Sequence, residues 1–77
     1  MENLKKSIEL AVDAYKAGNL SKAEADAKKL IDANPNVVFL YNFLGLISAQ
    51  QKKIEIALKY YEDGIKLNPN FALLYNN

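Results

Sequence analysis

Asn34-Pro35-Asn36 and Asn68-Pro69-Asn70 are the same tripeptide, 34 residues apart, and they contain the two prolines of this 77-residue chain. When residues 4–37 are aligned with residues 38–71, apolar and small residues also coincide. The coinciding pairs are Leu10 with Leu44, Ala11 with Gly45, Ala23 with Ala57, and Ile31 with Ile65. A period shared by turn, small and apolar residues indicates an internal repeat, and residues 72–77 begin a third copy.

Each copy of the repeat is predicted to form two helices joined by a short turn. Apolar residues recur at helical spacing from Leu4 to Tyr15 and from Val38 to Ile47, which predicts the first helix of each copy. The second helices are predicted to begin near Ser21 and at Ile54. No segment alternates in the manner of a strand, so the predicted class is all-α. Four pairs at the supportive i,i+4 spacing fall inside these helices: Glu2–Lys6, Glu24–Lys28, Glu55–Lys59 and Glu62–Lys66.

Turn residues predict where the helices end. Gly18 suits the left-handed position that follows a helix. Ser21 is expected to cap the next helix, with Glu24 three residues later completing a capping box. Proline disfavours helical geometry in the residue before it, so this helix is expected to stop at Asn34. The turn of the second copy, residues 51–53, contains no glycine.

The composition removes several classes of chemistry. The chain contains no Cys, His, Trp or Arg. Without Cys and His, the usual zinc ligands and the usual proton shuttle at neutral pH are missing. Without Arg there is no bidentate contact for phosphate, and a formal charge of +1 creates no field that attracts nucleic acid. We therefore expect no catalytic residues, no cofactor, no metal and no nucleic-acid partner.

No targeting or membrane-spanning segment is recognisable. The first residues lack the basic start and apolar run of a signal peptide. The longest apolar stretch, residues 37–49, is broken by Asn42 and Ser48 and is too short to cross a bilayer. The chain is expected to be cytoplasmic and to have no membrane partner.

The repeat resembles the tetratricopeptide repeat, a 34-residue helix–turn–helix unit with large, small and aromatic residues at fixed positions. The second copy carries this pattern at Tyr41, Leu44, Gly45, Ala57, Tyr61, Gly64 and Pro69. The first copy matches it at Leu10, Ala11, Ala23 and Pro35 and departs from it at Ser7, Ala14, Ala27 and Leu30. The resemblance implies antiparallel helix–turn–helix repeats stacked as a short right-handed α-solenoid, with repeats at 4–37 and 38–71 and a truncated third at 72–77. Nearly all the pattern residues are expected in the core.

In the resembling family, the first helices line a concave groove that binds a peptide or a partner helix. Carried over position by position, the groove would include Lys5, Ile8, Glu9, Val12, Tyr15, Lys16, Phe39, Asn42, Phe43, Leu46, Ala49, Gln50, Leu73, Asn76 and Asn77. Phe39, Phe43 and Leu46 have two interpretations, because a neighbouring repeat could cover them or they could anchor a partner. Asn42 could bind the backbone of a partner or satisfy a local network. The resemblance thus favours a protein–protein interaction module and not an enzyme.

The alternative function is structural, either self-assembly or spacing within a longer protein. The chain ends inside an expected first helix, so it is interpreted as a fragment of a parent whose catalytic domain could lie elsewhere. Two repeats fall below the roughly three that are needed for stability. The open C-terminal face is therefore expected to pair with a second copy as a homodimer, through Leu58, Tyr61, Ile65, Leu74 and Tyr75.

Overall fold

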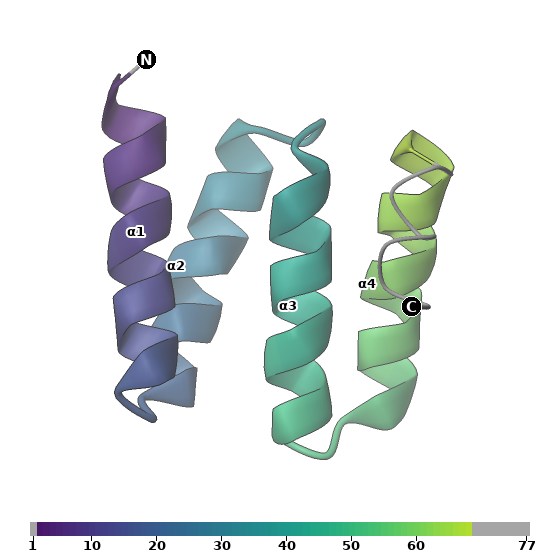
Figure 1. Cartoon of the computed structure of the whole chain (residues 1–77). Coiled ribbons are helices and arrows are strands. Elements are labelled where there is room, and N and C mark those ends of the chain that lie inside the picture. The colour runs from purple at the N-terminus through teal and green to yellow at the C-terminus, as the bar shows by residue number, and fades with distance from the viewer. Residues whose placement is uncertain (1, 69–77) are drawn as a thin grey trace.

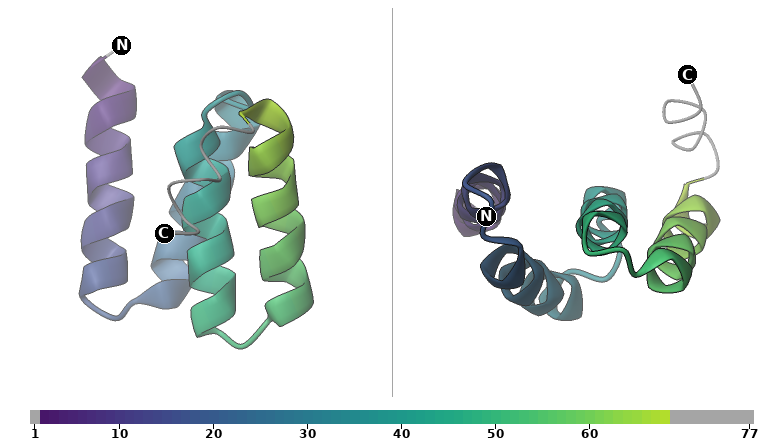
Figure 2. Two further views of the ribbon diagram at one scale, coloured as in Figure 1. Left: turned by 45° about the vertical axis from the view of Figure 1, so that its right-hand side comes forward. Right: turned by 90° about the horizontal axis from the view of Figure 1, so that it is seen from below.

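The computed structural model describes residues 2–68, with side chains from residue 4 onward. Over this range the chain forms four α-helices and no strand: α1 (Glu2–Lys16), α2 (Leu20–Ala33), α3 (Val38–Gln50) and α4 (Ile54–Leu67) (Figure 1). Each helix packs against the next in chain order. Figure 2 shows α1 and α3 in one layer, with α2 and α4 in the layer behind it. The predicted all-α class and the stack of helix–turn–helix units are confirmed.

The start of the predicted third copy, residues 72–77, lies outside the described residues. The predicted groove residues Asn76 and Asn77 belong to it, as do the predicted self-association residues Leu74 and Tyr75. The predicted pair Glu2–Lys6 also lies outside the described side chains.

Both helix–turn–helix units turn with the same backbone geometry. Gly18 has φ +86°, as its predicted left-handed position requires, and the Asn19 amide donates to the Ala14 carbonyl at 2.9 Å. Thirty-four residues later, Lys52 occupies the equivalent place with φ +66°, and the Lys53 amide donates to the Ser48 carbonyl at 2.9 Å. This is the Schellman arrangement, in which a left-handed residue ends the helix. The repeat therefore imposes the turn even where no glycine is present.

The start of α2 differs from the prediction. Asn19 is the capping residue, because its Oδ1 accepts a hydrogen bond from the Lys22 amide at 3.2 Å. Ser21 lies inside the helix and is exposed. The Schellman turn at Gly18 brings the chain into α2 two residues earlier than Ser21, so the predicted Ser21 capping box with Glu24 is wrong. The other predicted end is confirmed, since α2 stops at Ala33, immediately before Asn34.

The core joins the two units through α2 and α3. Its buried residues are small on α1 and α2 and large on α3. They are Ala11, Ala14, Ala23, Ala27, Phe43, Leu44 and Ile47. Leu10 was expected in the core as the equivalent of Leu44, but its side chain is 58% exposed. Leu44 packs in the cluster that α1 and α2 supply, whereas no described hairpin lies before α1 to cover Leu10.

Two glycines allow α3 and α4 to approach closely. A Cβ added to Gly45 would lie 2.7 Å from Tyr61 Cε1, so the Tyr61 ring fills the space that a side chain would need. A Cβ on Gly64 would lie 3.3 Å from Asn42 Oδ1. At both glycines of the repeat pattern, a side chain of one helix thus meets the backbone of the other.

A polar cluster between α2 and the α3–α4 turn also connects the two units. Gln51 Nε2 donates to Glu24 Oε1 at 3.2 Å, while Lys28 Nζ lies 3.2 Å and Lys53 Nζ 3.9 Å from Glu24 Oε2. The hydrogen bond from Gln51, together with the two ammonium groups, holds the pKa of the Glu24 carboxyl below its ordinary value, although burial opposes this shift. A second link is made by Tyr41, whose hydroxyl donates to the Pro35 carbonyl at 2.7 Å.

One of the three i,i+4 pairs predicted within the described side chains is formed. Glu24 and Lys28 are in contact. Glu55–Lys59 and Glu62–Lys66 are not among the ion pairs of residues 4–68, and Lys59 instead lies 4.0 Å from Asp63. Exposed pairs gain little free energy in water, so spacing alone does not hold them together. Glu24 differs because its carboxylate is also bound by Gln51.

We predict that Lys52→Gly stabilises the protein. A lysine at φ +66° is strained, and glycine removes this strain while adding entropy to the unfolded chain, which leaves a gain of about 0.5–1 kcal/mol in the free energy of unfolding. Urea denaturation measures the change. Lys53→Gly is the control, because Lys53 has φ −95° and carries no such strain. Equal effects of the two substitutions would contradict the prediction.

We predict that Gly45→Ala destabilises the protein by about 1 kcal/mol, despite the higher helix propensity of alanine, because the new methyl group collides with the Tyr61 ring. In a Tyr61→Leu background the collision is removed, and the same substitution is expected to become neutral or stabilising. A double-mutant cycle measured by thermal unfolding tests this coupling. An effect of Gly45→Ala that is the same in both backgrounds would show that the ring is not its cause.

Glu24 makes the stability of the chain depend on pH. Because the folded-state pKa of Glu24 is lowered, its contribution is fully present above the ordinary value of 4.5 and is lost as the pH falls through the lowered folded value. Glu24→Gln is expected to cost about 0.5–1 kcal/mol at pH 7 and to flatten the acid limb of the stability curve. Urea midpoints at neutral and acidic pH measure both effects.

The control for this experiment is Glu9→Gln, since Glu9 is exposed on α1. It is expected to retain the acid limb of the parent chain. If the Glu24→Gln and Glu9→Gln variants show the same dependence of stability on pH, the contacts of Glu24 are not the source of that dependence.

Candidate functional site

The third helix combines an uncharged sequence with partial exposure. No Asp, Glu, Lys or Arg occurs between Val38 and Gln50. Phe39 and Leu46 lie seven residues apart, hence on one side of the helix, and each is 40% exposed. These two side chains form an apolar strip on an uncharged helix, and contiguous exposed apolar surface is typical of interaction sites.

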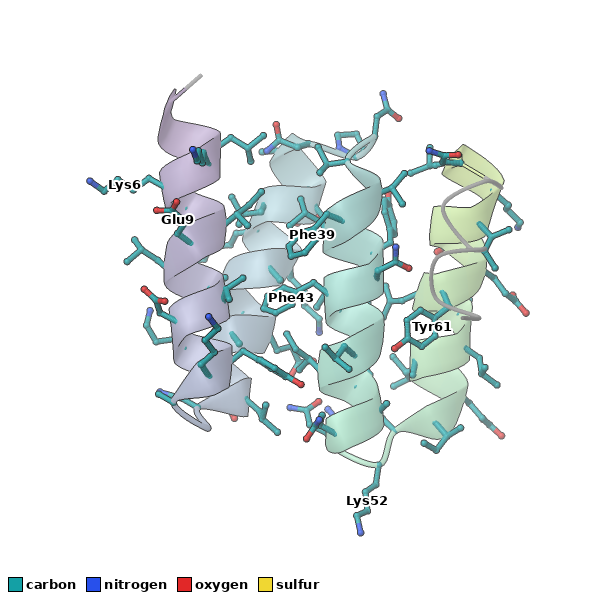
Figure 3. All side chains as sticks on the ribbon, in the orientation of Figure 1. Lys6, Glu9, Phe39, Phe43, Lys52 and Tyr61 are labelled. Atoms are coloured by element: carbon teal, nitrogen blue, oxygen red, sulfur yellow. The ribbon has the colours of Figure 1, made fainter. Side chains whose placement is uncertain are left out.

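An aromatic row leads from this exposed pair into the molecule. The rings of Phe39 and Phe43 are stacked, with centroids 5.6 Å apart and planes at 14°. Phe43 in turn meets the ring of Tyr15 edge-on, at 5.7 Å and 67°. Figure 3 shows Phe39 and Phe43 between α3 and α1. Phe43 is 5% exposed and is therefore covered by the neighbouring unit, whereas Phe39 forms the open end of the row.

Gln50 and Val12 extend this surface across the two first helices. Gln50 is exposed, and its Nε2 donates to the Tyr15 hydroxyl at 3.0 Å. Val12 is half-buried against the core. We call the surface formed by Val12, Tyr15, Phe39, Leu46 and Gln50 the first-helix face. Its five residues all belong to the groove predicted from the sequence, each is at least partly exposed, and together they span both units.

Asn42 is buried at the contact between α3 and α4. Its side chain is 6% exposed, and its Oδ1 lies against Gly64 of α4. Its Nδ2 is buried and has no hydrogen-bond partner, which carries a free-energy penalty. The structure thus directs the oxygen of Asn42 toward the contact between α3 and α4. Direct binding of a partner by Asn42 or Phe43 would require their present cover to move.

A second apolar surface was not anticipated from the sequence. A depression of about 390 Å³ between α1 and α2 is lined by Ser7, Leu10, Lys22, Asp26, Lys29 and Leu30. The pair Lys22–Asp26, at 3.1 Å, lies at its edge. Its apolar part consists of Leu10 and Leu30, and the repeat pattern had placed Leu10 in the core. The sequence signal that could have located it is the departure of the first copy from the repeat pattern at Ser7 and Leu30.

The structure offers few chemical groups for other kinds of site. Among the described residues, no group of three or more acidic side chains is placed to hold a metal ion. Glu62 and Asp63 are adjacent acidic residues on α4, and Asp63 Oδ1 lies 4.0 Å from Lys59 Nζ. None of the helices within residues 2–68 is both long enough and apolar enough to cross a bilayer.

Comparisons with known proteins agree with this arrangement. The tetratricopeptide repeat family matches residues 38–71. The chain is 33% identical, over 76 residues, to the UDP-N-acetylglucosamine–peptide N-acetylglucosaminyltransferase of Caenorhabditis elegans, a match that covers 99% of this chain and 7% of that protein. It is also 33% identical, over 48 residues, to the uncharacterized protein ycf37 of Pyropia yezoensis, with 62% of this chain and 27% of that protein covered. No solved structure matches the chain.

The chain thus spans a small part of both relatives. The tetratricopeptide repeat is a protein-interaction fold and not a catalytic one. The family match covers the α3–α4 unit, including Gly45, Tyr61 and Gly64, whose packing has been described above. The resemblance seen in the sequence is confirmed over residues 38–71, which match the tetratricopeptide repeat family.

Proposed function

We propose that this chain is a protein–protein interaction module and that the first-helix face binds an apolar segment of a partner, either an extended peptide or a helix. The observation that carries the proposal is the pair Phe39 and Leu46, each 40% exposed on a helix without charges. Because 40% of each side chain is still exposed, covering it with a partner is favourable by roughly 0.6–1.2 kcal/mol each. Binding of proteins or peptides is also what the tetratricopeptide family generally does.

The packing beneath this face supports its use as a rigid platform. The Phe39 ring stacks on Phe43, and Phe43 in turn contacts Tyr15, so the exposed Phe39 ring rests on a ring that is itself held in place. Pre-organised aromatic side chains lose little entropy when a partner binds. Gln50 adds a polar group at the same face, and its bond to Tyr15 fixes its direction.

The proposed contact residues are therefore fewer than the groove residues predicted from the sequence. Phe39 and Leu46 act as apolar anchors, while Gln50 and Val12 border them. Asn42 and Phe43 do not contact the partner but maintain the packing of α3 against its neighbours. A partner helix or an extended peptide that covers an apolar surface in this way is a common mode of peptide recognition.

Selection of peptides from a random library on the immobilised chain, followed by fluorescence titration of a selected peptide, tests the proposal. Phe39→Ala and Leu46→Ala are each expected to weaken binding about tenfold, since removal of an anchor typically costs more than 1 kcal/mol. The cross-peaks of these residues in an NMR titration are expected to shift with the same affinity.

Leu67→Ala is the matched control, because Leu67 is also 40% exposed but lies on α4, in the other layer. It is expected to leave the affinity unchanged. A selected peptide that binds all three variants equally well would place recognition elsewhere on the chain and reject the first-helix face.

A further inference from the structure

The last helix presents a continuous apolar stripe to solvent. Ile54 and Leu58 are each 55% exposed and Ile65 is 43% exposed, while Tyr61 lies half-buried among them. The spacing of these four residues is four, three and four, so they share one side of α4 over about 17 Å. We call these residues the α4 stripe. It belongs to the helix at the far end of the row from α1 (Figure 2).

The equivalent side of α2 shows what normally covers such a stripe. Thirty-four residues before Ile54, Tyr61 and Ile65 stand Leu20, Ala27 and Ile31, and these pack in the core beside α3. Ala27 is fully buried, and the other two are half-buried. The α4 stripe is thus the side on which a helix docks in the first unit. In α4 the same side is more apolar, because Leu58 stands where α2 has Glu24.

The stripe reads the same in both chain directions. If a second α4 lies antiparallel across it, Ile54 faces Ile65 of the second copy, and Leu58 faces Tyr61 of the second copy. Each large side chain then meets another large side chain, and none is left outside the contact. This property is what a two-fold symmetric interface requires, because the same patch must complement itself.

The charged residues beside the stripe have the same spacing as the stripe, and acidic and basic residues alternate along it. Glu55, Lys59, Glu62 and Lys66 follow one flank of α4, again at spacings of four, three and four. In the antiparallel pairing, Glu55 approaches Lys66 of the second copy and Lys59 approaches Glu62 of the second copy. In this register Glu55 lies opposite Gly64 of the second copy, so each Glu–Lys pair is displaced by two residues, or about 3 Å along the helix axis, which these long side chains can span. In a parallel two-fold pairing, this flank would lie on opposite sides of the interface in the two copies, and its charges would not pair with each other.

Glu55, Lys59, Glu62 and Lys66 do not form ion pairs with one another among the described residues. Among the described residues, Lys59 is the member of this set that takes part in an ion pair, with Asp63 at 4.0 Å, at the limit of contact. Glu55 and Lys66 occupy opposite ends of α4, too far apart to reach each other within one helix. A second copy supplies the complementary charge at each position.

From these observations we propose that two copies of the chain associate through antiparallel α4 helices, with the α4 stripe as the apolar centre and the Glu–Lys flank as the element that fixes direction. This interface lies on a different helix from Phe39 and Leu46, so it is independent of the proposed first-helix binding site. Flanking charges of this kind set partner choice and orientation in helix pairs.

Sedimentation equilibrium from low micromolar to millimolar concentration tests the proposal, with two charge variants of the full chain. Glu55→Lys/Glu62→Lys makes the flank entirely basic, and Lys59→Glu/Lys66→Glu makes it entirely acidic. Each variant alone is expected to dimerise at least about tenfold more weakly than the parent chain, because four attractive contacts become repulsive. An equimolar mixture is expected to form a 1:1 heterodimer at least as strong as the parent dimer.

Leu58→Glu is expected to abolish the dimer, whereas Ile56→Glu is expected to leave it unchanged. Ile56 is the matched control, since it is 50% exposed on the same helix but lies outside the stripe. Circular dichroism of each variant confirms that the helices are retained. A parent chain that stays monomeric at millimolar concentration would overturn the proposal and assign the stripe to other cover, such as the chain's own residues 72–77 or an unrelated helix. A mixture of charge variants that fails to form the heterodimer would overturn the antiparallel arrangement.

Discussion

The burial of α3 between α2 and α4 is the interaction on which the rest of the structure depends. Leu44 and Ile47 on one side of α3 complete the core of the first unit, and Gly45 on another side receives the ring of Tyr61. The α3 helix therefore packs against both of its neighbours, α2 and α4, at the same time. This demand explains why α3 contains no charged residue, since an unpaired charge on most of its circumference would be buried. The partly open side inherits the same uncharged character and becomes the surface for a partner.

The period of 34 residues made most of the fold predictable. It located four helices, the left-handed turn at Gly18 and the helix end at Asn34, because these depend on local backbone preference and spacing. Lys52 shows how strong this constraint is, since a lysine adopts the glycine geometry that its place in the repeat requires. Two local predictions were wrong for a common reason. Asn19 displaces Ser21 as the cap, and Lys59 lies near Asp63 and not in its predicted pair, because alternatives one or two residues apart differ by less than about 1 kcal/mol.

The candidate site was predictable in its location but less so in its details. Helical spacing places Phe39, Asn42, Phe43 and Leu46 on neighbouring positions, yet it does not distinguish the side toward α1 from the side toward α4. That distinction depends on interhelical packing, where Tyr15 covers Phe43 and Gly64 receives Asn42. Leu10 illustrates the same limit, because its environment is set by what lies beside its unit and not by its own residue type. In a repeat structure, identical positions acquire different exposure at the two ends.

This end effect gives the two proposed surfaces different physical origins. Phe39 and Leu46 are exposed although α3 has helices on both sides, so their exposure is a property of the repeat itself and would persist in any longer stack that leaves this side open. The α4 stripe is exposed because nothing described lies against α4 where α3 lies against α2. Covering the stripe with a helix therefore completes the same packing that already stabilises the core, whether that helix comes from the chain or from a second copy. The alternating Glu and Lys residues distinguish these cases, because a helix of the α3 type carries no charge with which to pair them, whereas a second α4 carries both.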